Sequence, residues 1–456
     1  MNRKWLAIFV TTLSLFCGSC CCVSQNGATV RLAYDVRAFG AVGDGKSKDT
    51  AAFQKALDTC AVNGGGDVQV PAGTYLIGSI QIGYATTIRL ADGATLTGSP
   101  DITDYPMMDV RWEGRWEQGH RALIYAGNVN HIGIVGPGHI IGSQALAHRT
   151  AGARNPILIE PISCKDVRLE GFSTQNWSLW STHPTYCSDV VIDHLNVKNG
   201  SDGLDIDSCD NVRIDSCDID SGDDSISLKS GRGMDGARIG KPCENILITR
   251  CTLADSNFAC IGIGSETSGG VRNVRIEHCK FVHSRTDAIY IKTRIGRAGV
   301  IENITGDDLD VLKGNGGFLQ INLISSGNSS TVDDTVTGDA GYPVGRNFSF
   351  SNVRVDCGTL ADVTKISPLK PLQGLTLSNI TGKCQRGISL VNVSGARLSG
   401  IHVTGFTGPL LATDNATGTG LEGAVKYFAP PPAAGRGGGA RGRGIPPGGA
   451  AITRPG

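Results

Sequence analysis

Two consecutive stretches of the chain decide the fold. Residues 187–208 read CSDVVIDHLNVKNGSDGLDIDS, and residues 209–230 read CDNVRIDSCDIDSGDDSISLKS. Both stretches are 22 residues long and align without a gap. Residues 243–265 and 271–293 fit the same template with one inserted residue. Self-similarity at a period of this length is typical of a solenoid, in which each repeat forms one coil.

Each repeat contains a V-x-I strand, a short turn and a second strand of I-x-I or I-x-L type. Because side chains alternate along a strand, the pairs Leu204/Ile206 and Ile226/Leu228 point inward, one above the other. Leucine-rich repeats have a similar period, but their regular leucine-and-asparagine pattern is absent. The sequence therefore predicts an all-β fold, a right-handed parallel β-helix solenoid.

The composition agrees with this fold. A chain of 456 residues normally suggests about two or three domains. A solenoid escapes that expectation because it buries its core between neighbouring coils and grows in one direction. The chain has 63 glycines and only 6% aromatic residues, which suits many short strands joined by tight turns.

The cysteines follow the repeat. Cys164, Cys187, Cys209 and Cys243 share one template position, and Cys217, Cys251 and Cys279 share another. Buried thiols behave as small hydrophobic side chains. We therefore expect internal columns of stacked free cysteines, with disulfides as the alternative.

Both ends of the solenoid need covering. Before the coils, residues 52–61 carry an apolar stripe at helical spacing, and Asp49 is placed to cap this helix. We expect a short N-terminal capping helix and a β-helix domain over residues 30–428. Residues 429–456 are rich in Pro, Gly and Arg and have almost nothing to bury, which predicts a disordered tail.

The N-terminus predicts export. Residues 1–22 read as a signal peptide, with Arg3 and Lys4 before the apolar run from Trp5 to Phe16. We expect an extracellular or periplasmic protein, and Cys20 to Cys22 leave a lipid anchor open. No later segment is long and apolar enough to span a membrane. The formal net charge is zero, which gives no sign of nucleic acid as a partner, and we expect a monomer.

The repeat alignment also predicts a cluster of carboxylates. Asp202 and Asp224 occupy the same template position on consecutive coils, so their backbones should lie about 4.8 Å apart. Asp223 lies beside Asp224. Three carboxylates this close cannot all ionise cheaply, so at least one pKa should rise. A neutral acid beside ionised bases is the arrangement that glycoside hydrolysis needs.

Two outward-facing columns border these acids. They are Asp207, Lys229, Gly264 and Lys292 in one, and Asp205, Ser227, Gly262 and Tyr290 in the other. Gly262 and Gly264 would leave a hollow in which a sugar approaches the backbone, and Lys229 and Lys292 would recognise an acidic substrate. The alternative is turn chemistry on a solvated face, with Lys229 neutralising Asp207. Trp177, Trp180 and Tyr186 are candidates for stacking on sugar rings, and His183 is expected to be structural.

At these residues the chain resembles glycoside hydrolase family 28, the polygalacturonases and their relatives. The resemblance rests on an ordered series of motifs: DVRAFGAVGDGKSKDTAAFQKAL at 35–57, VPAGTYLIGSI at 70–80, RWEGR at 111–115, WSTHPTYCSDVVI at 180–192, SDGLDIDS at 201–208, SGDDSISLKSG at 221–231, GIGSETSGGVRNV at 262–274 and YIKTRIGRAGVIENI at 290–304.

The resemblance implies a pectin-degrading enzyme that hydrolyses α-linked galacturonan with inversion. By position, Asp223 is similar to the general acid, and Asp202 and Asp224 to the pair that activates water. Lys292 matches the family lysine that contacts a substrate carboxylate. No cofactor or metal is implied.

The chain departs from the family pattern at the edge of this site. Gly200 and Ser201 replace the family's Asn-Thr before Asp202, although Asn199 lies one residue earlier. Phe258 stands at the family's histidine, and Tyr290 stands at its arginine. The acid and base machinery is therefore retained, while part of the uronate recognition is missing.

These departures keep three alternatives open. A hydrolase of rhamnogalacturonan or another substituted pectin fits the loss of the arginine. A lyase on the same fold would recruit calcium and a basic proton abstractor. A non-catalytic carbohydrate-binding β-helix would bind pectin without turnover.

Overall fold

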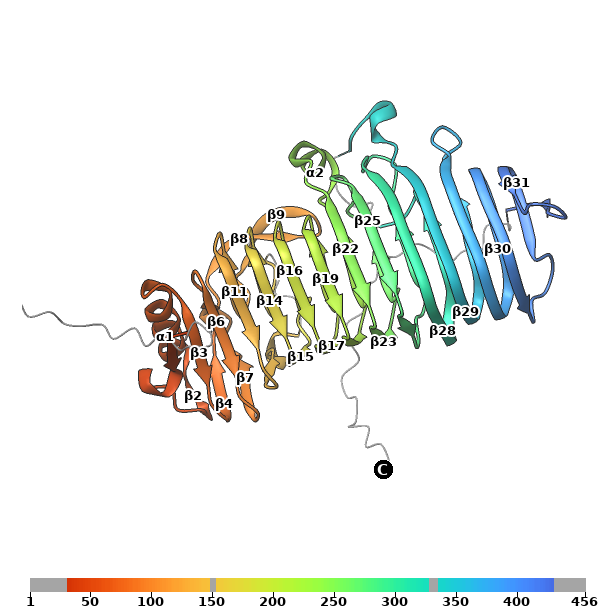
Figure 1. Cartoon of the computed structure of the whole chain (residues 1–456). Helices are drawn as coiled ribbons and strands as arrows, with labels where there is room; N and C mark the ends of the chain where they lie inside the picture. Colours follow the sequence, from red (N-terminus) through yellow and green to blue (C-terminus); the bar gives the residue numbers. More distant parts are fainter. Residues whose placement is uncertain (1–30, 148–152, 328–334, 430–456) are drawn as a thin grey trace, which may run out of the picture.

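The computed structural model describes residues 31–147, 153–327 and 335–429 and confirms the parallel β-helix (Figure 1). The expected signal peptide, 1–22, and almost all of the expected tail lie outside the described residues. Successive coils pair through parallel strands, and the register is unbroken around the predicted site on β18, β21, β24 and β27. Leu204 pairs with Ile226, and Ile226 pairs with Ile261, as the repeat alignment predicts.

The solenoid has three faces. The first face contains β1 (Ala33–Asp35), β3 (Gly66–Val70), β6 (Thr86–Leu90), β11 (Asn130–Val135), β14 (Lys165–Glu170), β16 (Ser188–Asp193), β19 (Asp210–Asp215), β22 (Cys243–Thr249) and β25 (Val271–Glu277). The second contains β2 (Asp44–Lys48), β4 (Gly73–Ile77), β7 (Ala94–Gly98), β12 (His139–Ile141), β15 (Ser173–Asn176), β17 (Asn196–Asn199), β20 (Asp218–Ser221), β23 (Thr252–Ser256) and β26 (Lys280–Phe281).

The third face carries the predicted site. It contains β5 (Ile80–Gln81), β10 (Ile124–Gly127), β13 (Ile159–Ile162), β18 (Leu204–Asp207), β21 (Ile226–Lys229), β24 (Ile261–Ile263) and β27 (Asp287–Lys292). Isolated bridges of Thr182 and Thr185 join β13 to β18.

Later strands are longer than one face. The first of them, β28 (Val300–Asn322), pairs in turn with β25, β26 and β27, and so continues all three faces. It is followed by β29 (Val344–Lys365), β30 (Leu372–Thr404), β31 (Leu411–Thr419) and β32 (Val425–Lys426).

A helix closes the N-terminal end, as predicted (Figure 1). It is α1 (Thr50–Val62), which packs against β1, β3, β5 and β6 through Phe53, Ala56, Leu57 and Cys60. The expected capping role of the Asp49 side chain is wrong. The Asp49 carboxylate instead accepts hydrogen bonds from the backbone N–H groups of Val42 and Gly43, at 2.7 and 3.1 Å, and so fixes the preceding loop.

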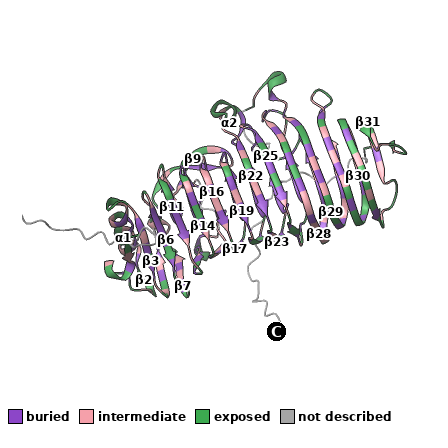
Figure 2. Cartoon of the chain, viewed as in Figure 1, coloured by how far each residue is buried: buried purple, intermediate pink, exposed green. Residues whose placement is uncertain are grey.

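The core runs the length of the solenoid between the three faces (Figure 2). The inward pairs are fully buried, and all eleven cysteines from Cys60 to Cys384 are buried and free, as predicted. Cys187 donates its N–H to the Sγ of Cys209 on the next coil, at 3.3 Å. Burial raises the pKa of the Cys243 and Cys260 thiols, so these thiols stay protonated and act as packing groups.

Few other elements interrupt the coils. They are the antiparallel hairpin β8 (Met107–Trp112) and β9 (Arg115–His120), the helix α2 (Gly233–Ile239), and the 3₁₀ turns η1 (Val36–Phe39), η2 (Ile102–Asp104), η3 (Gln144–Leu146) and η4 (Gly338–Gly341). The tip of the hairpin reaches the coil that follows β21, because Arg232 donates its N–H to the carbonyl of Gly114 at 3.2 Å. The hairpin therefore forms a wall beside the third face.

Candidate active site

The three predicted acids lie together where the chain enters β18 and β21. The N–H of Gly203 donates to the carbonyl of Asp224 at 3.0 Å, which places Asp202 and Asp224 side by side on neighbouring coils. Each is followed two residues later by an inward core residue, Leu204 or Ile226. The repeat itself therefore stacks the two carboxylates.

Asp224 is buried and held by four groups. Its Oδ2 accepts hydrogen bonds from Lys292 Nζ at 2.6 Å and from Ser227 Oγ at 2.9 Å. Its Oδ1 accepts from the N–H of Ala259 at 3.2 Å. The fourth is Gly262, which makes no bond but leaves room for the carboxylate. A Cβ at this position would lie 2.3 Å from Asp224 Oδ2.

Asp202 is also buried, but it is held by a different lysine. Its Oδ2 accepts a hydrogen bond from Lys229 Nζ at 3.0 Å and a longer one from Ser227 Oγ at 3.4 Å. The amide of Asn199 donates to the Asp202 carbonyl and to the carbonyl of Leu179. Asn199 thus fixes the backbone that presents Asp202.

Asp223 is the exposed acid of the three. Its carbonyl is fixed by the hydroxyls of Ser221 at 3.0 Å and Ser256 at 2.6 Å, which leaves the carboxyl to point out of the coil turn. The pKa of Asp223 is raised to about 7, because surrounding protein atoms desolvate its carboxyl and the charges of Asp202 and Asp224 oppose its ionisation. Asp223 can therefore hold a proton at neutral pH.

Each of the other two acids is paired with a lysine. Burial raises the pKa of Asp224, but the ammonium group of Lys292 acts against that rise. Burial opposes the charged form of Lys292, yet the Asp224 carboxylate outweighs it and the pKa of Lys292 is raised. The site thus combines two lysine-paired carboxylates with one carboxyl that has a proton to give.

Two predicted substrate contacts are not on the groove surface. Asp205 has no exposed surface, and Lys229 is only 6% exposed. Lys229 Nζ lies 2.5 Å from Asp205 Oδ1, and Asp207, its expected partner, instead pairs with Arg111 at 3.1 Å. The expectation that Lys229 and Asp205 face the substrate is therefore corrected, because both side chains turn into the solenoid wall.

The predicted glycine hollow is also corrected. The space beside Gly262 is filled by the Asp224 carboxylate, and a Cβ at Gly264 would lie 1.9 Å from the carbonyl oxygen of Lys292. Both glycines are needed for close approach within the protein. The structure gives neither of them an open space for a sugar.

The two departures from the family pattern meet at Lys292. The ring of Phe258 lies 4.3 Å from Lys292 Nζ, and that of Tyr290 lies 5.7 Å away. The two rings are 5.8 Å apart and inclined by 33°. Tyr290 is buried and bonds Ser326 at 3.0 Å, while Phe258 keeps part of its surface exposed.

The aromatic residues expected to stack on sugar rings also differ in burial. Trp180 is buried, with its ring 4.1 Å from Lys229 Nζ and 4.9 Å from the ring of His183. His183 is structural, as expected, since it is buried and bonds Glu160 at 3.3 Å. Tyr186 and Trp177 keep partial exposure.

Sequence reasoning missed Trp116 and Asp287. Trp116, on the hairpin wall, is 42% exposed and lies 6.3 Å from the ring of Tyr186, with Arg111 against both rings. No repeat signal marks it, because the hairpin lies outside the coil template. Asp287 lies two coils beyond Asp224 at the same template position, and the pKa of Asp287 is raised to about 7 by burial and by Asp362. The alignment of 271–293 contained that signal.

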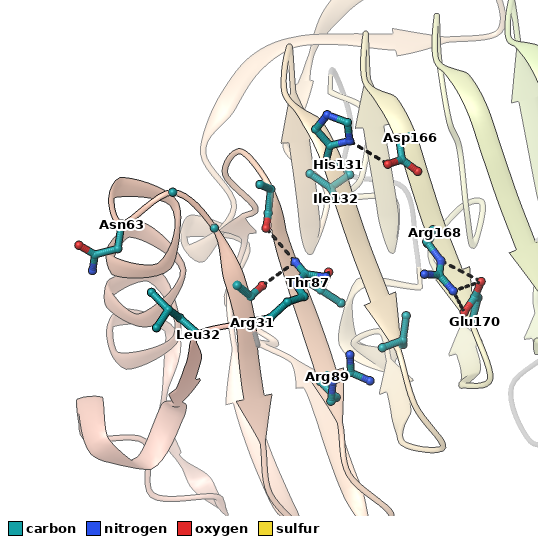
Figure 3. A pocket seen from close by; sticks show the side chains of 15 residues that line it. Arg31, Leu32, Asn63, Thr87, Arg89, His131, Ile132, Asp166, Arg168 and Glu170 are labelled. Carbon is teal, nitrogen blue, oxygen red and sulfur yellow. Dashed lines mark hydrogen bonds and ion pairs between the residues drawn. The ribbon is translucent and has the colours of Figure 1, made fainter. Parts of the chain in front are cut away.

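Figure 3 shows a hollow on the first face whose lining includes none of these acids. Its volume is about 570 Å³. Its charged groups pair with one another, as Arg168 does with Glu170 at 2.7 Å and His131 with Asp166 at 2.8 Å. Within residues 31–147, 153–327 and 335–429, no group of three or more His, Cys, Asp or Glu is arranged to hold a metal ion. In the same ranges no helix has the length and apolar character to cross a membrane.

Comparison with known proteins agrees with the geometry. A probable polygalacturonase from Vitis vinifera is 30% identical over 362 residues, which cover 75% of this chain and 72% of that protein. An exo-poly-alpha-D-galacturonosidase from Dickeya chrysanthemi is 25% identical, and the match covers 56% of this chain and 51% of the relative. The exopolygalacturonase of Thermotoga maritima has the same fold, with a TM-score of 0.69 at 23% identity over 81% of this chain and 92% of that one.

The sequence model of glycosyl hydrolases family 28 matches residues 60–330, more than half of the chain. This range includes all three acids, both lysines and the hairpin wall. Together with the shared β-helix, the match shows that the chain is a glycosidase that belongs to glycosyl hydrolases family 28.

Proposed function

We propose that this glycosidase is an exported, pectin-degrading hydrolase that cleaves α-1,4-galacturonosyl linkages with inversion. The observation that supports it is that the three acids differ in burial and in their contacts with lysines. Asp223 is exposed and its pKa is raised to about 7, whereas Asp202 and Asp224 are buried and each is paired with a lysine. A protonated acid beside ionised carboxylates is what inverting hydrolysis requires.

In the proposed reaction, Asp223 donates its proton to the glycosidic oxygen as the bond from that oxygen to the anomeric carbon breaks. A water molecule attacks the anomeric carbon from the opposite face of the sugar. Asp202 and Asp224 accept the proton that this water loses. Solvent exchange then returns a proton to Asp223 and removes one from the base, so that the site is restored.

The electrostatics favour these roles. At neutral pH a free aspartic acid is almost fully ionised, so an acid catalyst needs a raised pKa. The buried carboxylates supply part of that rise for Asp223 by repulsion. Each of these two carboxylates accepts a hydrogen bond from a lysine, Asp202 from Lys229 and Asp224 from Lys292.

A substituted pectin is a second candidate substrate, and one observation favours it. Lys292 is only 8% exposed, bonded to Asp224 and bordered by the rings of Phe258 and Tyr290. A sugar beside Asp223 would therefore meet an aromatic surface at Phe258. Such a surface suits rhamnogalacturonan or another pectin whose sugar at this position carries no carboxylate.

The test is to incubate the purified protein with polygalacturonate and with rhamnogalacturonan, beside an Asp223→Asn variant. Release of reducing ends without ultraviolet absorbance, lost in the variant, would establish hydrolysis and show the preferred polymer. Absorbance from unsaturated sugars would indicate a lyase and contradict the proposal. Nuclear magnetic resonance of the first product formed would then report its anomeric configuration, and retention of configuration would contradict inversion.

A further inference from the structure

We infer that Lys229, anchored on Asp205, is a positioning residue that pairs with the Asp202 carboxylate and holds it in place. This inference rests on the proposed function, because it assigns a role beneath the same catalytic acids. It replaces the expectation that Lys229 and Asp205 contact the substrate.

The ammonium group of Lys229 is already in contact with three buried protein groups. An ammonium group carries three donor hydrogens. Lys229 Nζ lies 3.0 Å from Asp202 Oδ2 and 2.5 Å from Asp205 Oδ1, and the ring of Trp180 covers it at 4.1 Å. All three neighbours are themselves at most 6% exposed. The ammonium group is therefore surrounded by protein groups rather than free in the groove.

Asp205 holds the lysine in place. The two residues face one another from neighbouring coils, Asp205 on β18 and Lys229 at the end of β21. Burial raises the pKa of Asp205, and the charge of Asp202 raises it further. The pKa of Lys229 is raised well above its usual value, since the attraction of Asp205 and Asp202 outweighs the burial that opposes its charge. Lys229 is thus a permanent cation beneath Asp202.

Every charged group around Asp202 fits this assignment. Asp223 and Asp224 are further carboxyl groups in the turn before β21, and their pKa values respond to the charge of Asp202. Asp205 on β18 is another carboxyl group, and Lys292 on β27 is a cation that contacts Asp224 instead. Lys229 is the cation that touches Asp202, just as Lys292 is the cation that touches Asp224. Removing Lys229 would therefore leave Asp202 surrounded by other carboxyl groups, without a cation in contact.

The test compares Lys229→Met with Lys370→Met in the full chain. Lys370 forms a surface ion pair with Asp339 at 2.8 Å, so its replacement controls for the loss of a paired lysine. With polygalacturonate, Lys229→Met should lower kcat on the order of 100-fold and change KM less than about threefold. The acid limb of the pH profile should move up by about one pH unit or more, since a contacting opposite charge lowers a carboxyl pKa by about 1–3 units. Asp205→Ala should also lower kcat, because Lys229 would lose its anchor.

If Lys229 instead bound the substrate, its replacement would change KM more than kcat. If Lys229→Met raised KM about tenfold or more, with kcat and the acid limb unchanged, the inference would be overturned. A second measurement does not depend on activity. The melting temperatures of Lys229→Met, Asp202→Asn and the double variant should not be additive, and the double variant should melt above Lys229→Met. Additive losses would overturn the pairing.

These readouts separate the two proposals. If the wild-type protein cleaves neither pectin polymer, the proposed function fails while the melting temperatures still decide whether Lys229 neutralises Asp202. If the protein cleaves polygalacturonate and Lys229→Met leaves the pH profile in place, the function stands and the inference fails.

Discussion

Replacing Gly262 with alanine tests how closely the site depends on the position of one carboxylate. A Cβ at Gly262 would lie 2.3 Å from Asp224 Oδ2 and 2.8 Å from its Cγ. Gly262 lies within β24, in unbroken register with Ser227 and Tyr290, so alanine fits the extended backbone of the strand. The clash in Gly262→Ala must therefore be relieved by the Asp224 side chain.

The size of the effect follows from these distances. Ordinary contact lies at roughly 3.4 Å or more, so Oδ2 must move by about 1 Å from its position 2.3 Å away. The bonds from Lys292 at 2.6 Å and Ser227 at 2.9 Å cannot both survive that movement. A misplacement of about 1 Å costs on the order of 100-fold in rate, which is about 2.7 kcal/mol of activation free energy.

The assay is the release of reducing ends from the preferred pectin polymer, with kcat and KM measured separately. Thermal unfolding of the same samples checks that the coil is intact. Gly133→Ala is the matched control, because Gly133 is a buried strand glycine on the first face whose Cβ would meet Thr87 at 3.2 Å. If Gly262→Ala keeps kcat within about threefold of wild type, Asp224 does not need its observed position and the reasoning is refuted.

Four further predictions concern charge and burial. Hydrolysis should fall as the pH rises through about 7, where Asp223 loses the proton that it donates, and a pH profile without that limb would exclude Asp223 as the acid. The raised pKa of Asp223 also means that the folded state binds more protons than the unfolded state between about pH 4 and pH 7, so stability falls across that window, and Asp223→Asn should show a smaller fall in pH-dependent denaturation. Arg111→Met should lower the free energy of unfolding by about 3–5 kcal/mol in urea titrations, because Asp207 would stay buried without its partner at 3.1 Å. Iodoacetamide should leave the eleven buried thiols unmodified in the native protein and react with them only after unfolding, as mass spectrometry would show.

The sequence was sufficient to predict the fold because every repeat carries the same pattern of inward apolar residues. A 22-residue period with inward Ile and Leu pairs buries those pairs when each coil stacks on the next. The cysteine positions follow for the same reason, since any residue at an inward template position becomes part of the core. Asp202 and Asp224 were placed together by that register alone.

The directions of side chains were harder to predict. Outward alternation placed Asp205 and Lys229 away from the core, but it did not reveal that Trp180 and the neighbouring coil enclose them. The hairpin wall presents the same difficulty. Arg111 comes from about one hundred residues earlier in the chain to pair with Asp207, and no local pattern records that contact.

The enclosure of Lys229 changes how the acid cluster should be understood. Four carboxyl groups (Asp202, Asp205, Asp223 and Asp224) and two lysines lie close together, and the lysines do not contact all four. Each buried carboxylate contacts one lysine, and the exposed one feels both only from a distance. Desolvation of its carboxyl and repulsion from Asp202 and Asp224 together raise the pKa of Asp223, which keeps a proton up to about pH 7. On this argument the lysines do not need to touch the substrate to serve the reaction, because they determine which of the three acids has a proton to give.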